Sequence, residues 1–470
     1  MRSSHNSPRI EQAAVKKLLE FVESRQDARP TGDLEQFERD VRALVMEVER
    51  ELVEEELARY DIDLEVIEVD GIRHRRVQRC AETYFGAAGE LRVTRSLYST
   101  REDGVRCVCP MELRAGILEG RWTPLAAKQA TWAVAHMTPQ EGEDLFRMVG
   151  GMSPSKSSLD RLPKLLGRRW EEERLHFEEE LRVSEPIPAE ATTLAVSLDG
   201  VMLPMKDGAR AQKRERAKAR GKKLAGPTGY QEVACGTVSF LDAEGERLST
   251  IRLARMPEPK KETLKLMLEE EVRGALQSRP DLRLVKIADG ARDNWTYLDE
   301  LPAGEAVVDF YHAAEHLHGA VVAAYGETSR TGQAQFEKLR HLLRHDERGV
   351  DKVIRAVRHL RQRFPRRTQL DVEVKYFQRN RKRMRYARAA ARGLPIGSGV
   401  VEAACKTLVA QRMKRSGMRW RDEGGQAILT LRGLVQSNRF DRAWKLLAGT
   451  YKRSVTLPGN LLPFPDRVAA

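Results

Sequence analysis

Three apolar segments in the middle of the chain each end in an aspartate, and this repetition restricts the possible folds more than any other feature. The segments are residues 194–200, 282–290 and 306–309, and their aspartates are Asp199, Asp289 and Asp309. Short apolar runs bounded by turn residues are typical of strands covered on both faces of a sheet. Two further strand patterns and one helical pattern lie between them, at residues 231–241, 248–254 and 262–276. This order predicts a mixed α/β sheet.

The three aspartates would lie just beyond the carboxyl ends of their strands, where reactive groups gather in open α/β sheets. Two carboxylates ~5 Å apart repel by about 3 kcal/mol at an effective dielectric constant of roughly 20, so such a site shares a proton or binds a divalent cation. Without supporting His or Cys ligands, carboxylates favour Mg²⁺ or Mn²⁺ over zinc. A single Asp-Gly after a strand is often only a turn, but its repetition favours a functional site.

A fourth carboxylate is predicted on a late helix. The Gly397-Ser398-Gly399 turn opens this helix and puts Glu402 about one turn inside it, on a face of small and apolar residues that would turn toward the sheet. The alternative is an exposed pair with Lys406 four residues later, which would contribute only ~0.3–0.5 kcal/mol.

The segment before Glu402 is strongly basic. Residues 352–392 hold 15 Lys and Arg against Asp371 and Glu373, and this net charge of +13 equals that of the whole 470-residue chain. Such a concentration favours a nucleic-acid channel over an ordinary solvated face. Long helices are predicted over residues 336–392. Tyr376, Phe377 and Tyr386 interleave with the charges, which would suit contacts with unpaired bases.

Two other basic segments flank the predicted site. One spans residues 210–223, after Asp199, and the other spans residues 411–420 and ends in Trp420, which could stack on a base or pack in the core. The residues predicted to contact DNA are Arg379, Arg381, Lys382, Arg383, Arg385, Arg412, Lys414, Arg415 and Trp420.

The N-terminal part is predicted to be mainly helical, with a small β-meander. An acidic amphipathic helix covers residues 35–70. The meander covers residues 71–108, with strands at 84–86 and 91–98, a turn at Gly89-Glu90, and Arg92 and Arg95 pointing outward. Helices follow at residues 126–136 and 139–149, and a third helical stretch ends near Leu181.

A Gly/Ser/Pro turn at residues 150–158 separates the last two helical patterns, as in a helix-turn-helix. The basic residues of the second element are Lys156, Arg161, Lys164, Arg168 and Arg169. Pro163 would interrupt that helix unless it falls in the first turn, with Asp160 as the cap. Residues 186–188, Pro-Ile-Pro, indicate a linker.

Several protein classes are not expected. No run approaches ~18 apolar residues, so no membrane span is expected. The first eight residues lack an apolar core, so no secretory signal is expected. Five scattered cysteines argue against a disulfide framework, and Cys107-x-Cys109 has the wrong spacing for a zinc site. A cytoplasmic protein with reduced thiols is expected. The mean hydropathy of −0.53, with 32% charged residues, is polar but within the globular range.

Four ordered motifs carry a family resemblance. They are residues 197–201 (Ser-Leu-Asp-Gly-Val), 287–292 (Ile-Ala-Asp-Gly-Ala-Arg), 309–317 (Asp-Phe-Tyr-His-Ala-Ala-Glu-His-Leu) and Gly397-Ser398-Gly399-x-x-Glu402. Together they resemble bacterial insertion-sequence transposases of the ISKra group, which look like distant relatives of the Mutator-type DDE transposases. The resemblance covers at least residues 192–444, and residues 90–98 also look like the family's N-terminal region.

The resemblance implies an RNase H-like catalytic domain with a helical insertion before the last acid. It implies that Asp199, Asp289 and Glu402 are catalytic and hold two Mg²⁺ (or Mn²⁺) ions. Asp309-x-x-His312 resembles the Cys/Asp-x-x-His motif of the family, so Asp309 and His312 are expected to be accessory. The alternative triad of Asp199, Asp309 and Glu402 stays open. Strand order favours Asp289, because three strands and a helix precede the strand that ends there.

These expectations divide the chain into an acidic helical region (1–70), a β-meander (71–110), a helical, DNA-binding region (111–185), the catalytic domain (190–315 and 394–450) and a basic helical insertion (316–393). The expected function is a DNA transposase that cleaves and joins strands at the ends of its own element. Its expected partners are double-stranded element ends and target DNA, bound as a homodimer. A metal-dependent nuclease or resolvase on the same fold, or a domesticated non-catalytic DNA-binding protein, are the alternatives.

Overall fold

The computed structural model describes residues 13–26, 29, 32–100, 107–206, 208–222 and 229–457. The chain forms two compact units, an N-terminal unit of residues 1–170 with 441–470 and a central unit of residues 171–440. This division falls before the Pro-Ile-Pro segment at residues 186–188, and the chain after Phe440 returns to the N-terminal unit. The first eight residues, for which no secretory signal was expected, lie outside the described part. No helix in the described part is long and apolar enough to cross a membrane.

The N-terminal unit contains a helical hairpin and the predicted small β-sheet. The helices are α1 (Ala13–Ser24) and α2 (Leu34–Arg59), and the antiparallel strands are β1 (Val66–Val69), β2 (Ile72–Gly86), β3 (Gly89–Ser99) and β9 (Val455–Thr456), in the order β3-β2-β1-β9. The acidic helix was predicted to reach Asp70. It ends at Arg59, because the apolar residues that follow pair into the sheet as β1.

Two details of the meander differ from the prediction. The β2–β3 turn lies at Ala87-Ala88, and Gly89 already pairs with Gly86. Arg92 is exposed, but Arg95 does not point outward: its side chain is 15% exposed and forms ion pairs with Glu82 and Glu112. Arg95 lies on the same face as buried Val93 and is neutralised there by these two carboxylates.

Helices complete the N-terminal unit and lead into the central one. They are α3 (Pro110–Ala115), α4 (Pro124–His136), α5 (Pro139–Val149), α6 (Lys156–Glu172) and α7 (Arg174–Ser184). Thr138 and Glu141 form a capping box that starts α5 where it was predicted. The third helical stretch is two helices. Pro163 is buried inside α6 beyond its first turn, and Asp160 does not cap it but pairs with Lys164. A DNA-contacting role for α5 and α6 stays a prediction.

The central unit is built on a five-stranded mixed sheet, as predicted. Its strands are β4 (Thr193–Pro204), β5 (Tyr230–Leu241), β6 (Arg247–Arg255), β7 (Arg283–Ala288) and β8 (Glu305–Val308), in the order β6-β5-β4-β7-β8. β5 runs antiparallel to both β4 and β6, whereas β4, β7 and β8 are parallel. The mixed α/β class is confirmed, and this strand order is compatible with an RNase H-like domain.

The parallel register brings the three aspartates to one edge of the sheet. Ser197 pairs with Ile287, so Asp199 and Asp289 each lie two residues beyond a matched pair. Ala288 pairs with Val308, and the next residue, Asp309, donates its backbone N–H to the Ala288 carbonyl at 2.8 Å. The predicted strand end at Asp199 is wrong, because β4 stays paired with β5 as far as Pro204. Only its parallel pairing with β7 stops before Asp199, so three residues separated by up to 110 positions still share one border of the parallel part of the sheet.

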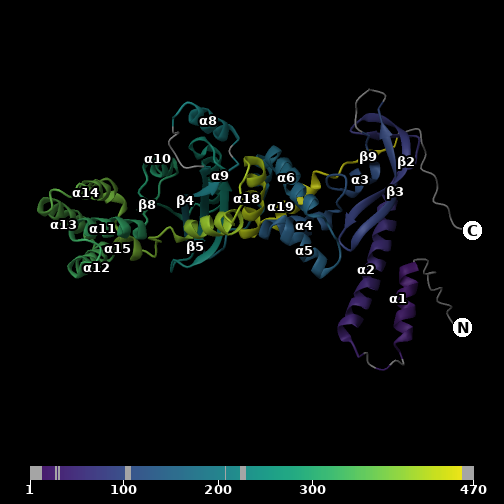
Figure 1. The fold of residues 1–470 in the computed structure, drawn as a ribbon, viewed down its shortest axis with the longest axis horizontal. Helices are drawn as coiled ribbons and strands as arrows, with labels where there is room; N and C mark the ends of the chain where they lie inside the picture. Colours follow the sequence, from purple (N-terminus) through teal and green to yellow (C-terminus); the bar gives the residue numbers. More distant parts are fainter. Residues whose placement is uncertain are drawn as a thin grey trace, which may run out of the picture. The chain divides into compact units, whose positions relative to one another are not determined.

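Helices surround this sheet and extend to one end of the unit (Figure 1). They are α8 (Gly208–Ala219), α9 (Glu262–Ser278), α10 (Arg292–Glu300), α11 (Phe310–Tyr325), α12 (Arg330–His345), α13 (Gly349–Arg363), α14 (Gln369–Asn380), α15 (Tyr386–Ala390), α16 (Gly399–Ala404), α17 (Gln411–Met413) and α18 (Asp422–Gln436). The last helix, α19 (Phe440–Gly449), belongs to the N-terminal unit except for its first residue. One apolar core runs from the sheet into the insertion: Val285 and Val308 belong to the same cluster as Val353 and Phe377. The insertion is therefore packed as part of the unit.

A buried ionic cluster joins α7 and α9 to the end of α18. The Arg439 guanidinium donates to both oxygens of Glu271, at 2.6 and 2.9 Å, and to Glu185. Glu178 is buried close by and pairs with Arg174 at 3.1 Å. Burial raises the pKa of Glu178 to about 7, with the Glu271 charge adding to the effect and Arg174 opposing it.

We expect the Glu178→Gln variant to become more stable than the wild type as the pH rises. The folded pKa of about 7 exceeds the ordinary value of 4.5, so stability present below pH 4.5 is lost as the pH rises through 7. The amide removes this loss, which is on the order of 1–3 kcal/mol. Urea denaturation at pH 5 and pH 8.5 measures it, with exposed Glu179→Gln as the control. An equal difference at both pH values would contradict the expectation.

Candidate functional site

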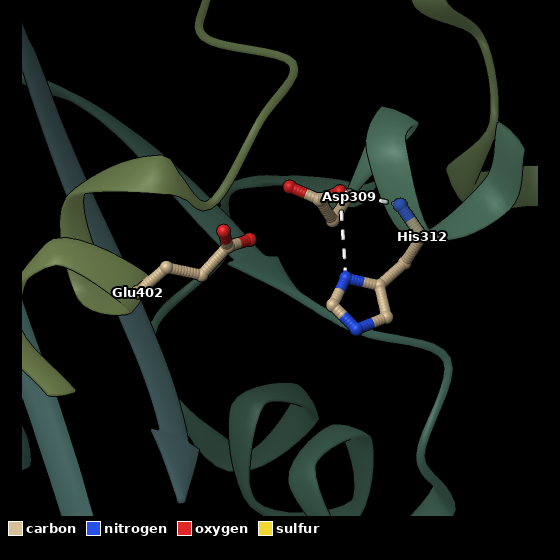
Figure 2. Close-up of side chains that lie close together, drawn as sticks. All are labelled: Asp309, His312 and Glu402. Carbon is tan, nitrogen blue, oxygen red and sulfur yellow. Dashed lines mark hydrogen bonds and ion pairs between the residues drawn. The ribbon is translucent and has the colours of Figure 1, made fainter. Parts of the chain in front are cut away.

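The centre of the site is the carboxylate of Asp309, which is fully buried. Its Oδ1 accepts the backbone N–H of His312 at 2.8 Å, so Asp309 caps the N-terminus of α11. Its Oδ2 accepts the backbone N–H of Ser398. The His312 Nδ1 lies 3.6 Å from Oδ1 (Figure 2). Asp309 is therefore a helix cap, and the same side chain also holds the Ser398 turn.

Hydrogen bonding decides the charge states of this pair. Burial alone would raise the pKa of Asp309, but the hydrogen bonds from His312 and Ser398 outweigh it and lower that pKa to about 2. The hydrogen bond to Asp309 raises the pKa of His312 to about 9, against the opposing effect of burial. At neutral pH the structure therefore holds an ionised Asp309 beside a protonated His312.

Glu402 reaches the same place from α16. Ser398 precedes this helix, and its hydroxyl donates to Glu402 Oε1 at 3.2 Å. Potential ligand atoms of Asp309, His312 and Glu402 all lie within 4.8 Å of one another, and Figure 2 shows the Glu402 carboxylate directed toward the other two side chains. Among the described side chains, no ion pair joins Glu402 to Lys406, which was the alternative partner.

Asp199 is half-buried at the middle of β4 and contacts the continuation of the same helix. Its Oδ1 accepts the N–H of Gly200 at 2.7 Å, and the Cys405 thiol lies 3.8 Å from Oδ2. Cys405 follows Glu402 by three residues, at the point where the helix widens into a π-helical turn (Cys405–Ala410). Such turns occur often at functional sites. The helix that carries Glu402 is thus anchored before it by Asp309 and after it by Asp199.

Asp289 is half-buried and is held in its own turn. Its Oδ1 accepts the N–H of Ala291 and the side-chain amide of Asn294, both at 3.0 Å. Gly290 is needed beside it, because a Cβ there would lie 2.2 Å from the ring of Tyr376. The charge of Asp289 also contributes to raising the pKa of His312, so the two groups interact across the site.

The structure thus brings Asp309, His312 and Glu402 together most closely. Asp199 and Asp289 lie on the same edge of the sheet but outside this group of three. The assignment of Asp199, Asp289 and Glu402 as the catalytic triad stays a prediction.

The predicted DNA contacts in the insertion differ in how exposed they are and in whether an acidic side chain pairs with them. Arg379, Arg381 and Lys382 are exposed. Arg383 pairs with Asp299 at 2.6 Å and covers the Trp295 ring at 4.2 Å, and Arg381 and Arg385 both pair with Asp351. Acids outside residues 352–392 therefore neutralise part of the positive charge that the sequence assigned to a DNA channel. Exposed basic residues of this segment for which no ion pair is seen in the described structure are Arg355, Arg358, Arg363, Arg366, Arg367, Lys375, Arg379, Lys382 and Arg388.

Four side chains proposed for nucleic-acid contact are buried. Tyr376, Phe377 and Tyr386 are 6%, 0% and 1% exposed, because they fill the core shared by the insertion and the sheet. Arg412 is 2% exposed and lies over the Trp420 ring at 5.6 Å. The prediction that these side chains contact nucleic acid is therefore wrong. Spacing in the sequence does not distinguish an exposed aromatic ring between basic residues from a ring that is buried in the core below them.

The remaining residues of the late basic segment lie at the surface or near it. Lys414 and Arg415 are exposed, and Trp420 is half-buried with its indole N–H donating to the Met413 carbonyl at 2.8 Å.

Sequence reasoning missed Tyr311, an aromatic residue that is 55% exposed beside the site, with its ring against Gly397. The sequence could have indicated Tyr311 by its position directly before His312, inside the Asp309-x-x-His312 motif.

Comparisons with known proteins add little to this geometry. No family model matches the chain, and no curated protein matches it in sequence. Among solved structures, it is similar to a Drosophila P element transposase strand transfer complex, with 11% sequence identity over 70% of this chain and 81% of that chain. The TM-score is 0.25, too low to establish a shared function.

We expect the His312→Gln variant to lose stability mainly at acidic to neutral pH. The folded pKa of His312 is about 9, above the ordinary 6.5, so its contribution is complete below pH 6.5 and is lost as the pH rises through 9. On the acid side, the contribution of Asp309 is lost as the pH falls from 3.8 through about 2. Thermal denaturation at pH 6 and pH 10 measures the difference.

The control is His359→Gln, at an exposed position of the same unit. Its melting temperature should follow that of the wild type at both pH values. A His312→Gln deficit that is as large at pH 10 as at pH 6 would rule out the charged pair.

Proposed function

We propose that this chain is a DNA transposase that cleaves and joins strands at the ends of its own element, with Asp199, Asp289 and Glu402 as catalytic carboxylates. The observation that supports this most directly is the convergence of carboxylates on one sheet edge. Asp199, Asp289 and Asp309 lie there, and Glu402 is held near Asp309 through the Asp309–Ser398 contact. Grouped carboxylates in a basic protein are suited to metal-assisted phosphoryl transfer on nucleic acid.

The donor chemistry fits Mg²⁺ or Mn²⁺. Asp199, Asp289 and Glu402 are half-buried or exposed and offer carboxylate oxygens, which hard cations prefer. Asp309 is less suited, because both of its oxygens already accept backbone N–H groups. The Nδ1 of His312 faces the Asp309 carboxylate, 3.6 Å from Oδ1. Bound at these carboxylates, the cations would polarise the scissile phosphate and lower the pKa of an attacking water.

The chain's own residues have separate tasks in this proposal. Asp309 orients the Ser398 turn, and this turn sets the position of Glu402. The protonated ring of His312, with a side chain that is 38% exposed, presents positive charge to a phosphate at the site. The exposed cations of the insertion would hold the DNA backbone nearby without reading its sequence.

We expect Asp199→Asn, Asp289→Asn and Glu402→Gln each to lower strand cleavage by at least about a hundredfold, because each removes a charged oxygen ligand. The substrate is a plasmid that carries the DNA flanking the chain's own coding sequence on both sides, incubated with Mg²⁺. Asp293→Asn is the matched control, since this exposed acid lies four residues after Asp289, in the first turn of α10.

The outcomes separate the alternatives. Cleavage at the wild-type rate by Asp199→Asn would sink the proposal. Loss of cleavage in Asp309→Asn together with full activity in Asp289→Asn would assign the second acid to Asp309. Cleavage without joining of a precleaved end to a target plasmid would identify a nuclease or resolvase.

We expect the double substitution of Lys375 and Lys382 by Gln to weaken duplex DNA binding several-fold. Both side chains are exposed, and no ion pair is seen at either in the described structure. Each lost phosphate contact should lower the slope of log Kd against log salt by about 0.9. Fluorescence anisotropy between 50 and 200 mM NaCl measures both quantities. Arg247→Gln, at the exposed start of the opposite edge strand β6, should change neither.

A further inference from the structure

The strand that carries Asp199, β4, continues past the point where its pairing with β7 ends. β7 pairs with β4 only as far as Ser197, whereas β4 and β5 remain paired as far as Pro204 and Tyr230. The two strands therefore form a two-stranded extension of about 17 Å past Asp199. The chain between them contains α8, drawn in teal in Figure 1. We call this extension, with α8 and the residues up to Lys222, the arm.

The end of the arm is basic. Arg216, Lys218, Arg220 and Lys222 are exposed, and none of them forms an ion pair in the described structure. Glu215 is the acid among them. These residues belong to the longer basic segment of residues 210–223 that was identified from the sequence. Lys223 lies outside the described residues.

A second basic segment, about 200 residues later, is attached to the base of the arm. The backbone of Trp420 pairs with that of Met205: its N–H donates to the Pro204 carbonyl at 3.1 Å, and its carbonyl accepts from Lys206 at 2.6 Å. The turn before Trp420 carries exposed Lys414 and Arg419. This contact joins the second basic segment to the end of β4, the strand that carries Asp199 and leads into α8.

Buried contacts hold this turn in place. The Trp420 indole donates to the Met413 carbonyl, and the buried Arg412 guanidinium lies over its ring. Gly417 has a φ of 78°, which allows the chain to reverse between Lys414 and Trp420. The cations are thus presented by a fixed turn. A polyanion that contacts both segments would neutralise their positive charge.

Resting on the proposed function, we propose that the arm and the adjoining turn bind the phosphate backbone of duplex DNA that enters the site at Asp199. The contacts come from Arg216, Lys218, Arg220, Lys222, Lys414 and Arg419. All six are Lys or Arg, which suits phosphate contacts, and phosphate contacts carry no sequence information. Binding through this surface is therefore independent of DNA sequence.

The test measures binding of two 40-base-pair duplexes of unrelated sequence to the full-length chain, by anisotropy between 50 and 200 mM NaCl. The arm variant replaces Arg216, Lys218, Arg220 and Lys222 by Gln, and the turn variant replaces Lys414 and Arg419 by Gln. Each should lower the salt slope by up to about 0.9 per side chain, equally for both duplexes. The double variant R216K/R220K should bind like the wild type, because a phosphate contact needs the charge and not the guanidinium shape.

Unchanged affinity and slope in both Gln variants would overturn the inference. So would a loss confined to one duplex, or tighter wild-type binding of single-stranded RNA or poly-glutamate than of duplex DNA. The Asp199→Asn variant separates this inference from the proposed function. If it abolishes cleavage while the arm variant binds DNA normally, only the inference about the arm fails. If it retains cleavage while the arm variant loses binding, only the assignment of catalysis fails.

Discussion

The carboxylate of Asp309 is the interaction on which the candidate site depends. A fully buried carboxylate is costly unless hydrogen bonds and a counter-charge compensate it. Here His312 and Ser398 donate their backbone N–H groups, and the imidazolium of His312 lies beside it. These partners come from the start of α11 and from the turn that opens α16. Stabilising one buried charge therefore joins the end of β8 to the helix of Glu402.

The other end of that helix is held by a different strand. The Cys405 thiol contacts Asp199, just where α16 passes into a π-helical turn. Glu402 lies between these two anchors and takes its position from them. This arrangement separates two kinds of acid. Asp309 is fully buried and suited to orienting its neighbours, whereas Asp199 and Asp289 are half-buried and Glu402 is exposed.

Positive charge is distributed differently from what a count along the chain indicates. Several arginines of the insertion are neutralised by acids such as Asp299 and Asp351, which lie outside the basic segment. Meanwhile, the basic segment at residues 411–420 is joined through the Met205–Trp420 contact to the end of β4, which leads into the other short basic segment. The positive potential near the candidate site therefore depends on the basic side chains that have no acidic neighbour. The net charge of the chain does not identify these side chains.

The sequence by itself determined the strands of the central sheet, the aspartates on or directly after three of them, and the late helix of Glu402, because apolar runs and turn residues are local signals. It did not show that β4 continues past Asp199 to Pro204. It could not show that Arg412 and Tyr376 are buried, or that Val66–Val69 pairs with a strand near residue 455. Only the tertiary structure decided that Asp309 holds the N–H of Ser398, 89 residues away. A backbone N–H is the same in almost every residue, so its distant partner has no sequence signature and is chosen by packing alone.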